Sequence, residues 1–356
     1  MHINYCTLFD INYIDKGLAM YESLNRVAED YTLFIVAFDE NTFHILSDMK
    51  LKNVCVLQEE DLLDEELQKV KAERTRAEWC WTCSAVIIDF LMNKYELQNC
   101  VYLDSDLYFF ANPKVLVEEM VQEGGEVLIT EHRFGRGIEN YLIAHMYGKF
   151  CVQFTAFVND VKGRTVLNWW KEMCIQDCSI NGSYEVYGDQ KYQDQFEKRF
   201  AGVHVLRNEG GGLAPWNIGQ YYLKQENGKI EIVNKKTERK FPLIFYHFQG
   251  FELLGRDYVN LSVYKWTGRK VDEKLVSAVY ERYTQALQRV RKRLEGNYAC
   301  NFDRQADELK ESKIQRKKDS CIRRRMGQIL VSILSYIRIR IYSKKDLCKM
   351  IDQRSL

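Results

Sequence analysis

Short apolar runs alternate along the chain with longer segments in which apolar residues recur every three or four positions. Runs of branched and aromatic residues are typical of buried strands, and the longer period is that of a helix. The expected strands are residues 3–9, 33–38, 54–57, 99–103, 126–130, 150–159 and 242–246. Helices are expected at residues 13–27, 42–49, within 59–94 and at 163–174. This alternation indicates βαβ units, and therefore an α/β fold with a largely parallel sheet.

The second half of the chain is less regular until a helical period begins. A glycine-rich turn is expected at residues 210–212. From Asp272 onward apolar residues recur with helical spacing, at Leu275, Val279, Tyr283, Leu287, Val290 and Leu294. We therefore expect a sheet domain at residues 1–265, followed by a helical appendix at 266–318.

The last segment, residues 319–356, is a basic tail with an amphipathic pattern. One helical face carries Ile322, Met326, Ile329, Ile333 and Ile337. Elsewhere on the wheel lie Arg323, Arg324, Arg325 and Arg338. Two interpretations stay open. The helix either docks on the core or lies on an anionic membrane surface, which its basic flanks and short apolar stripe suit. Alternation of isoleucine and arginine after residue 337 has strand period, which argues against a longer helix.

Composition narrows the class of protein. With 356 residues, 46% hydrophobic content and three prolines, the chain can bury a large core. Its 51 basic and 50 acidic residues nearly cancel, so the overall charge gives no reason to expect nucleic acid as a partner. The 11 cysteines include one CxxC, Cys80 and Cys83, without a second pair, which favours reduced thiols. We see no secretory signal and no spanning segment, so we expect a cytoplasmic protein.

The residues that first suggest chemistry are Asp104 and Asp106, on either side of Ser105 at the end of a predicted strand. Carboxylates at the carboxyl end of a strand lie where α/β sheets bind ligands, and they are oxygen ligands for a divalent cation. Two surface carboxylates in a turn are the alternative interpretation. Polar residues farther along the chain favour the cation-site interpretation. A site that binds a metal and a diphosphate requires further polar groups of this kind.

A lone histidine, His247, closes the predicted strand 242–246 and is followed by Gly250. A neutral imidazole added to two carboxylates makes a ligand set that suits Mn²⁺. Gly250 allows main-chain N–H groups to approach phosphate oxygens closely. Taken alone, His247 is more often a hydrogen-bonded core histidine.

A third signal is Asp189-Gln190, in a loop that leads into a helix. An aspartate at such a place commonly caps the helix. The pair also offers planar acceptors and amide donors for sugar hydroxyls. Capping would be the default interpretation if the other signals were absent.

Taken in order, five segments resemble GT-A-fold glycosyltransferases, and most closely family 8 and its bacterial relatives that use nucleotide-diphospho-sugars. The segments are residues 8–13, 102–106, 188–190, 215–217 and 247–250. The resemblance spans residues 3–250. It implies a GT-A fold, which is a Rossmann-like mixed sheet flanked by helices.

The resemblance also implies roles for individual residues. Asp10 would accept a hydrogen bond from a uracil-like base, although other bases also offer a ring N–H, and Tyr13 would stack on the ring. Ser105, Arg76 and Gly250 match the nucleotide and phosphate contacts. Metal ligands would be Asp104, Asp106 and His247, holding Mn²⁺ or Mg²⁺, and the catalytic pair near the donor sugar would be Asp189 and Gln190.

The chain departs from the family at several positions. The lysine that commonly follows the last glycine is absent, and Arg256 is the expected substitute. Gln153-Phe154-Thr155 stands where the family has Asn-x-Gly, so the donor sugar stays open. Arg76 is the nearest match to an arginine in the helix before residue 99. Glu131 and His132 are candidates for the acceptor side, with a structural role as the alternative.

The function expected from these residues is hexosyl transfer from a UDP-sugar to a glycan or lipid-linked acceptor, with retention of configuration, in surface polysaccharide synthesis. The bound cation would stabilise the leaving diphosphate. The basic tail would place the protein at the inner face of the membrane. Two other classes are a catalytically silent GT-A-like scaffold of an assembly complex and a haloacid-type phosphatase, in which the first aspartate is the nucleophile.

Overall fold

A computed structural model of the chain describes residues 1–180, 186–226, 229–254, 258–263, 266, 271–302 and 341–343. The chain divides into two compact units. The first comprises residues 1–213 and 241–247, and the second 214–240 and 248–356. The three-part division expected from the sequence stays a prediction, because most of the basic tail lies outside the described residues.

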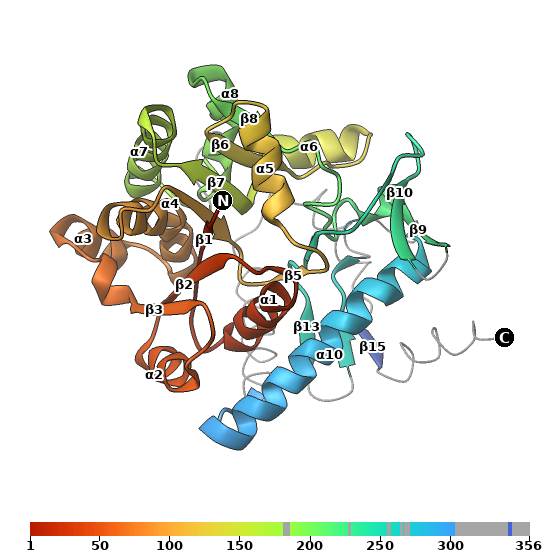
Figure 1. Cartoon of the computed structure of the whole chain (residues 1–356), viewed down its shortest axis with the longest axis horizontal. Helices are drawn as coiled ribbons and strands as arrows, with labels where there is room; N and C mark the ends of the chain where they lie inside the picture. The colour runs from red at the N-terminus through yellow and green to blue at the C-terminus, as the bar shows by residue number, and fades with distance from the viewer. Residues whose placement is uncertain are drawn as a thin grey trace, which may run out of the picture. The chain divides into compact units, whose positions relative to one another are not determined.

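The first unit is built on a seven-stranded sheet with the order β3-β2-β1-β4-β7-β6-β8 (Figure 1). Its strands are β1 (Ile3–Phe9), β2 (Tyr31–Ala37), β3 (Val54–Gln58), β4 (Asn99–Leu103), β6 (Val127–Glu131), β7 (Phe150–Val158) and β8 (Val203–Val205). β1 pairs in parallel with β2 and β4, whereas β7 is antiparallel to both of its neighbours. The predicted α/β class with a mostly parallel mixed sheet is confirmed.

Helices flank this sheet (Figure 1). They are α1 (Ile14–Val27), α2 (Glu40–Met49), α3 (Glu65–Glu73), α4 (Arg76–Lys94), α5 (Lys114–Gln122), α6 (Ile138–Tyr147), α7 (Val161–Gln176) and α8 (Phe196–Arg199), with short 3-10 turns η1 (Glu59–Leu62) and η2 (Gln190–Gln195). α4 packs on β1 and β4, and α7 packs on β7. α4 starts at a capping box in which Thr75 and Glu78 satisfy each other's main-chain N–H groups.

Several boundaries differ from the expectation. The segment 59–94 breaks into η1, α3 and α4, and the sequence analysis did not foresee α5, α6 or β8. The strand expected at 242–246 is shorter and ends one residue later, as β12 (Phe245–His247), which pairs with β5 (Leu107–Phe109). Pro242 has no N–H to donate, and the N–H of Ile244 bonds to the carbonyl of Gly210, so the ladder starts only at Phe245.

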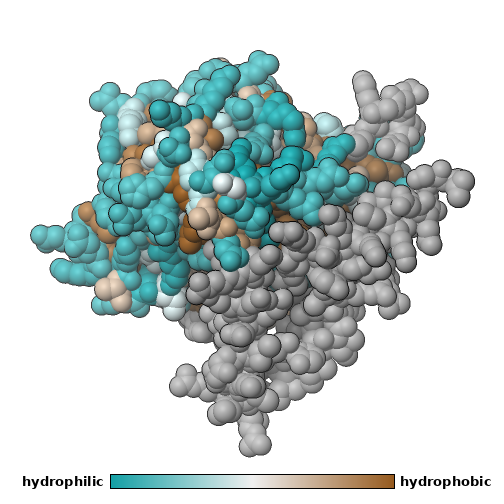
Figure 2. All heavy atoms as spheres, turned by 90° about the horizontal axis from the view of Figure 1, so that it is seen from below, coloured by the Kyte–Doolittle hydropathy of each residue, from teal (hydrophilic) through white to brown (hydrophobic). Residues whose placement is uncertain are grey.

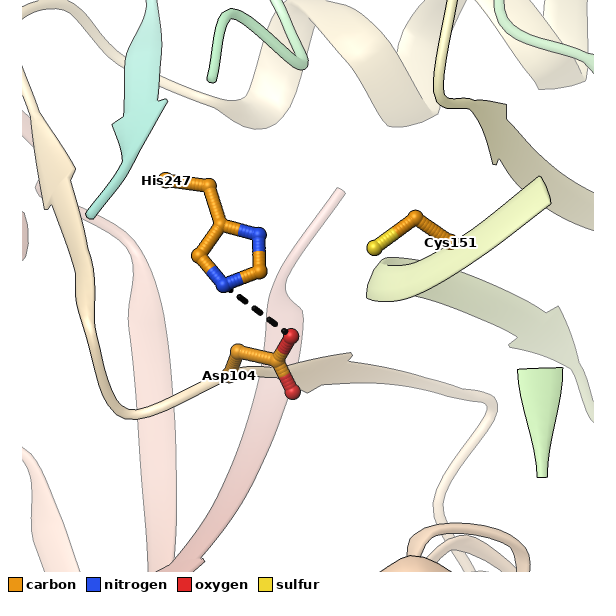
Figure 3. Close-up of side chains that lie close together, drawn as sticks. All are labelled: Asp104, Cys151 and His247. Carbon is orange, nitrogen blue, oxygen red and sulfur yellow. Dashed lines mark ion pairs between the residues drawn. The ribbon is translucent and has the colours of Figure 1, made fainter. Parts of the chain in front are cut away.

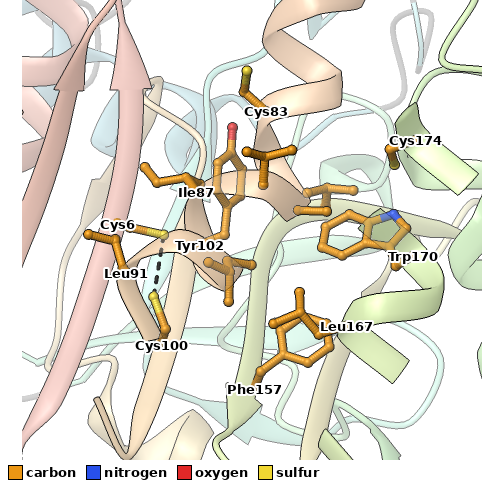
Figure 4. Close-up of a cluster of buried hydrophobic side chains, with 14 of the residues drawn as sticks. Cys6, Cys83, Ile87, Leu91, Cys100, Tyr102, Phe157, Leu167, Trp170 and Cys174 are labelled. Carbon is orange, nitrogen blue, oxygen red and sulfur yellow. Dashed lines mark hydrogen bonds between the residues drawn. The ribbon is translucent and has the colours of Figure 1, made fainter. Parts of the chain in front are cut away.

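The core of the first unit lies between the sheet and the helices α4 and α7 (Figure 4). Every residue of β1 is buried, as expected for a central strand covered on both faces. The thiols of Cys6 on β1 and Cys100 on β4 meet at 3.5 Å. In the described parts of the chain, nine cysteines are free thiols. This apolar centre fixes the places where the strands end.

The ends of β1 and β4 define the important edge of the sheet. β1 is followed in sequence by β2 on one side, whereas β4 lies on its other side, so the chain reverses its direction of winding between β1 and β4. In α/β sheets, ligands bind outside the carboxyl ends of the strands at such a switch point. Asp10 follows β1 and Asp104 follows β4, so both lie at this edge. Because β7 is antiparallel, its first residues reach the same edge.

The second unit contains a hairpin and a long helix. Its elements are η3 (Ile218–Gln220), β9 (Tyr221–Glu226), β10 (Lys229–Asn234), β13 (Glu252–Leu254), β14 (Tyr258–Asn260), β15 (Ile341–Ser343) and α10 (Glu273–Tyr298), and β11 (Lys240–Phe241) lies at its boundary in the sequence. Leu275, Val279 and Leu294 on α10 are buried, which confirms the predicted C-terminal helical extension. Phe248 stacks on Tyr283 of this helix at 3.7 Å between ring centroids.

The basic amphipathic helix expected from Ile322 to Ile337 lies outside the described residues, and so does the strand period noted after it, apart from Ile341, where β15 begins. In the described residues, no helix has both the length and the apolar character needed to cross a membrane. The face seen in Figure 2 is mainly hydrophilic where its residues are described, with hydrophobic ones in small groups.

Candidate active site

The two aspartates predicted as metal ligands lie in the turn between β4 and β5. Ser105 lies between them and is half-buried. The turn is held by the N–H of Leu107, which donates to the carbonyl of Asp104. β12 pairs with β5 in a register that places His247 opposite Leu107. The antiparallel pair therefore brings an imidazole from 140 positions farther along the chain next to the Asp-x-Asp turn.

His247 contacts both carboxylates with the same nitrogen. Its Nε2 lies 3.0 Å from Asp106 Oδ1 and 3.6 Å from Asp104 Oδ2. Its other nitrogen, Nδ1, lies 2.9 Å from Oε1 of Gln153. An amide oxygen only accepts, so Nδ1 carries the hydrogen and Nε2 is the nitrogen directed at the carboxylates. The sequence analysis did not assign Gln153 a role at His247.

Burial and the neighbouring charges set the proton affinities. Burial, and then the charge of Asp106, raises the pKa of Asp104 to about 6, although His247 opposes this. Burial also acts to raise the pKa of Asp106, but the charge and hydrogen bond of His247 hold that pKa below its usual value. Burial would lower the pKa of His247, but Asp106 and Asp104 together raise it well above the usual value. A positive charge at Nε2 is therefore stabilised from two sides.

The three side chains fit a divalent cation. Two carboxylates and an imidazole are ligands that Mn²⁺ accepts, and Gln153 holds the imidazole in the tautomer that leaves Nε2 for a metal. The side chain of Asp104 is 28% exposed, compared with 13% for Asp106 and 6% for His247. Asp104 is thus the more solvent-exposed of the two carboxylates.

Asp10 and Arg76 meet beside this turn, although 66 positions separate them in the sequence. An Nη2 of Arg76 lies 3.4 Å from Oδ2 of Asp10 and donates to the carbonyl of Phe38 at 2.7 Å. The buried carboxylate of Glu59 lies 3.7 Å from the other guanidinium nitrogen. Asp39 accepts from the N–H of Ile11 at 2.7 Å and so holds the loop after β1. The structure therefore brings together two residues that the sequence assigned to nucleotide binding.

Tyr13 is 44% exposed and offers an aromatic surface at the start of α1. The ammonium group of Lys16, one turn later, lies 4.2 Å from the centre of its ring. The charge of Lys16 also helps to lower the pKa of Asp106, after the larger effects of burial and His247. The sequence analysis missed Lys16, and its position one helical turn after Tyr13 was the available signal.

Asp189 is buried just before η2, and its main-chain carbonyl accepts from the indole N–H of Trp170 at 2.9 Å. Burial raises the pKa of this carboxyl to about 7, and the charge of Asp104 adds to the shift. Among the described residues, its Oδ2 has no hydrogen-bond partner. Gly188 precedes it with a φ of +56°, and a Cβ there would lie 2.8 Å from the ring of Trp81. The backbone at this point therefore requires glycine.

Gln190 and Lys191 connect the start of η2 to α6. The amide Nε2 of Gln190 donates to the carbonyl of Tyr147, and Nζ of Lys191 donates to the carbonyl of His145. A helix leaves its last carbonyls without partners inside the helix. Gln190, from the predicted catalytic pair, and its neighbour Lys191 thus satisfy two carbonyls at the C-terminal end of α6.

One face of α6 exposes large apolar side chains. Ile138 is 81% exposed, Tyr141 70%, Leu142 50% and Met146 39%. Their spacing of three, one and four residues places them on the same side of the helix. A helix of a soluble protein normally turns such a face to the core, so this exposed face indicates a binding surface.

The two acceptor-side candidates differ in exposure. The carboxylate of Glu131 pairs with Nζ of Lys149 at 2.8 Å and is 31% exposed. His132 is buried and stacks on Phe134 at 4.7 Å between ring centroids. Burial, and to a smaller extent the nearby His247, lowers the pKa of His132 to about 3. His132 is therefore a neutral, packed residue, as the structural interpretation expected.

Gly250 belongs to the second unit, where it has a φ of +71°. A Cβ at this position would approach the hydroxyl of Ser262 to 2.8 Å, so the backbone again favours glycine. Arg256, expected to replace the missing lysine, lies outside the described residues. The phosphate roles of Gly250 and Arg256 stay predictions.

Comparisons with known proteins find relatives by sequence and neighbours by structure. No family model matches it. The uncharacterized protein YfnD of Bacillus subtilis (strain 168) is 29% identical over 289 residues, which cover 80% of this chain and 89% of YfnD. Among solved structures, mouse xyloside xylosyltransferase 1 has a TM-score of 0.44 and 15% identity, covering 70% of this chain and 98% of that one. The galactosyltransferase LgtC, solved with donor and acceptor sugar analogs, has a TM-score of 0.45 and 11% identity, covering 80% and 95%.

The chain resembles GT-A-fold glycosyltransferases. Because the TM-scores are below 0.5, the function proposed below rests on the side chains of this protein and on their contacts.

Replacing Gln153 by leucine tests the role of this amide in orienting His247. Without the acceptor for Nδ1–H, the imidazole loses its fixed tautomer, and we expect the dissociation constant of Mn²⁺ to rise about 10- to 100-fold. The measurement is calorimetric titration of the purified protein with MnCl₂. Gln193→Leu is a matched control, because Gln193 is also buried but donates to Thr155. Equal losses in the two variants, or none in Gln153→Leu, would contradict the assignment.

Replacing Asp189 by asparagine tests its raised pKa. The carboxyl holds its proton up to about pH 7 in the folded chain, compared with an ordinary pKa of 3.8, so the folded state binds more protons between these values. The free energy of unfolding therefore falls as pH rises across this interval, by at most about 4 kcal/mol. With a chelator present, we expect the loss of thermal stability between pH 5 and pH 8 to be smaller in Asp189→Asn than in the natural protein.

The control for this measurement is Asp48→Asn, which changes an exposed carboxylate on α2. It should keep the pH dependence of the natural protein. If Asp189→Asn also keeps the pH dependence of the natural protein, the pKa of Asp189 is not raised in the folded chain.

Proposed function

We propose that this protein is a divalent-cation-dependent glycosyltransferase that moves a hexose from a UDP-sugar to a glycan or lipid-linked glycan. One observation carries the proposal. His247 Nε2 lies within 3.6 Å of both Asp104 and Asp106 at the switch point of the sheet. Asp10 and Arg76 lie at the end of the neighbouring strand β1, where a nucleotide attached to the diphosphate would extend.

The nucleotide would bind along the loop after β1. Asp10 accepts a hydrogen bond from a ring N–H of the base, and the exposed ring of Tyr13 supports the base from one face. Arg76 is held by Glu59 and by the carbonyl of Phe38, so it orients Asp10 and adds positive charge at this end. Ser105 offers a hydroxyl to the ribose. Uracil is the base that the motif resemblance favours.

Asp104, Asp106 and His247 would hold the cation, with Mn²⁺ the best match to this mixed ligand set. When bound, it would neutralise charge that develops on the leaving diphosphate. Lys16 acts on the same region, because its charge already reaches Asp106. Similar glycosyltransferases commonly have a lysine after the glycine that Gly250 matches, and this chain lacks it. We assign its positive charge to Lys16.

The donor sugar would meet Asp189 and Gln190. With a pKa of about 7, the carboxyl of Asp189 donates or accepts a hydrogen bond near neutral pH, which suits a sugar hydroxyl. One N–H of the Gln190 amide donates to the carbonyl of Tyr147, so its second N–H and its oxygen would be the groups offered to the sugar. An amide is a poor nucleophile, so retention would follow from attack on the same face as the departing diphosphate.

The exposed face of α6 supports an acceptor with an apolar part. Gln190 binds the last residue of α6, so a molecule resting on Ile138, Tyr141 and Leu142 would lie on the helix whose C-terminal end contacts a donor-sugar residue. Lipid-linked glycans carry such an apolar part beside their sugar. Their use in surface polysaccharide synthesis, at the inner face of a membrane reached by the basic tail, remains part of the proposal.

Two other classes fit less well. In a haloacid-type phosphatase, the first aspartate is a nucleophile and the imidazole has no role, whereas here Nε2 of His247 contacts both carboxylates. A silent scaffold would not need to keep two carboxylates and an imidazole together in a largely buried place, since such a cluster is costly without a ligand. The intact cluster therefore favours catalysis.

Calorimetric titration with UDP tests the proposal directly. We expect UDP to bind the purified protein only when Mn²⁺ is present, because Asp104, Asp106 and His247 would hold the cation and its charge would offset that of the diphosphate. Asp106→Asn removes a ligand and should weaken this binding by at least about 100-fold, while Asp48→Asn on α2 should leave it unchanged. A screen of UDP-sugars for slow hydrolysis then identifies the donor. The proposed site would be wrong if UDP bound with the same affinity without Mn²⁺ and in Asp106→Asn.

The acceptor proposal is tested with a pair of glycosides that share one sugar but carry either an octyl or a methyl group. We expect the natural protein to have a lower KM for the octyl glycoside. In the double variant Ile138→Ser, Leu142→Ser, the ratio of the methyl to the octyl KM should fall about tenfold, which corresponds to 1.4 kcal/mol. Donor hydrolysis should be kept. Val161→Ser is the control, because Val161 is 84% exposed on α7. An unchanged KM ratio in the double variant would exclude α6 as the acceptor surface.

A further inference from the structure

A cysteine to which no role was assigned from the sequence lies next to the proposed cation site. Sγ of Cys151, a carboxylate oxygen of Asp104 and an imidazole nitrogen of His247 all lie within 4.8 Å of one another. The three side chains point toward one another from β7, from the end of β4 and from β12 (Figure 3). Cys151 is 4% exposed, so it is enclosed with this group.

An irregularity in β7 places the cysteine there. Leu128 of β6 pairs with Ala156, but Thr130, two residues later, pairs with Cys151, so β7 has extra residues between these pairs. The hydroxyl of Thr155 donates to the carbonyl of Val152 inside the irregular segment. Such bulges redirect side chains next to binding sites. Here the result is that both Cys151 and Gln153 lie against His247.

The cysteine changes the donor set. Asp104, Asp106 and His247 supply hard oxygens and one imidazole, which suit Mn²⁺ and Mg²⁺, whereas a thiolate favours softer ions such as Zn²⁺. Catalytic zinc sites commonly use three protein ligands and leave one position open. With the known bond lengths, two ligands of one tetrahedral ion lie roughly 3.5 Å apart. The three atoms lie within 4.8 Å of one another, so the group would have to tighten by about 1 Å or less to hold one ion.

We propose that Asp104, Cys151 and His247 form a second cation-binding mode, selective for Zn²⁺ and Co²⁺, at the place where Mn²⁺ is needed. On binding, the thiol releases its proton to solvent, Sγ and the imidazole Nε2 each form a bond to the ion, and a carboxylate oxygen of Asp104 completes the set. This mode rests on the proposed function in one respect: because Asp104 and His247 are shared, Zn²⁺ displaces Mn²⁺ and inhibits transfer. Cys151 thus makes the enzyme sensitive to the ratio of these two cations.

Cobalt spectroscopy tests the proposal. Titration of the full chain with Co²⁺ should produce a near-ultraviolet charge-transfer band, which arises only when a thiolate binds the ion. Cys151→Ser should abolish this band. Cys80→Ser should keep it, which separates Cys151 from the Cys80 and Cys83 pair on α4. A band that persists in Cys151→Ser, or is lost in Cys80→Ser, would overturn the proposal.

Affinity measurements separate this inference from the proposed function. Cys151→Ser should weaken Zn²⁺ binding by about tenfold or more, while its Mn²⁺ binding stays within about threefold, because the thiolate contributes chiefly to softer ions. A cobalt band that depends on Cys151, without any binding of UDP, would support the cation mode and reject the nucleotide-sugar site. Equal losses of Zn²⁺ and Mn²⁺ affinity would reject the selectivity proposed for Cys151.

If Cys151→Ser does not fold, the natural protein still decides the question. X-ray absorption of the zinc-loaded chain should show a sulfur neighbour at about 2.3 Å in the natural protein and in Cys80→Ser. A zinc environment of nitrogen and oxygen alone would overturn the proposal.

Discussion

The whole site depends on one imidazole nitrogen that lies between two carboxylates. Two negative charges placed this close in a largely buried turn repel each other, and each loses water that would otherwise solvate it. A positive charge at Nε2 of His247 relieves both costs, whether a proton or a cation supplies it. The opposite pKa shifts of Asp104 and Asp106 express this sharing, because Asp106 makes the closer contact with the imidazole.

A small number of long-range strand pairings places these side chains together. β1 and β4 end side by side, and their buried pairing fixes the distance between Asp10 and the Asp-x-Asp turn. β12 pairs with β5 immediately after that turn, so the position of His247 is tied to the backbone of the residues it contacts. Gln153 then locks the ring from the other side. Each functional side chain is thus positioned by strand ends, which are more rigid than free loops.

The donor and acceptor sides of the proposed reaction are connected through α6. Its exposed apolar face is unusual for a helix of this kind, and its last carbonyls are satisfied by Gln190 and Lys191. A molecule that shifts α6 would therefore also move Gln190, one of the residues assigned to the donor sugar. In the proposed function, α6 would link the acceptor surface to the donor-sugar residues through these two hydrogen bonds.

The sequence by itself determined the class of fold and the order of the chemical groups. Asp104 and Asp106 follow an apolar run, and His247 follows another, so local patterning alone puts them at strand ends. It did not determine that Arg76 meets Asp10, that Gln153 and Cys151 face His247, or that α6 leaves its apolar face open. Those depend on strand order and on the irregular register between β6 and β7. A one-residue change of register reverses the direction of every side chain, and no local period in the sequence encodes that choice.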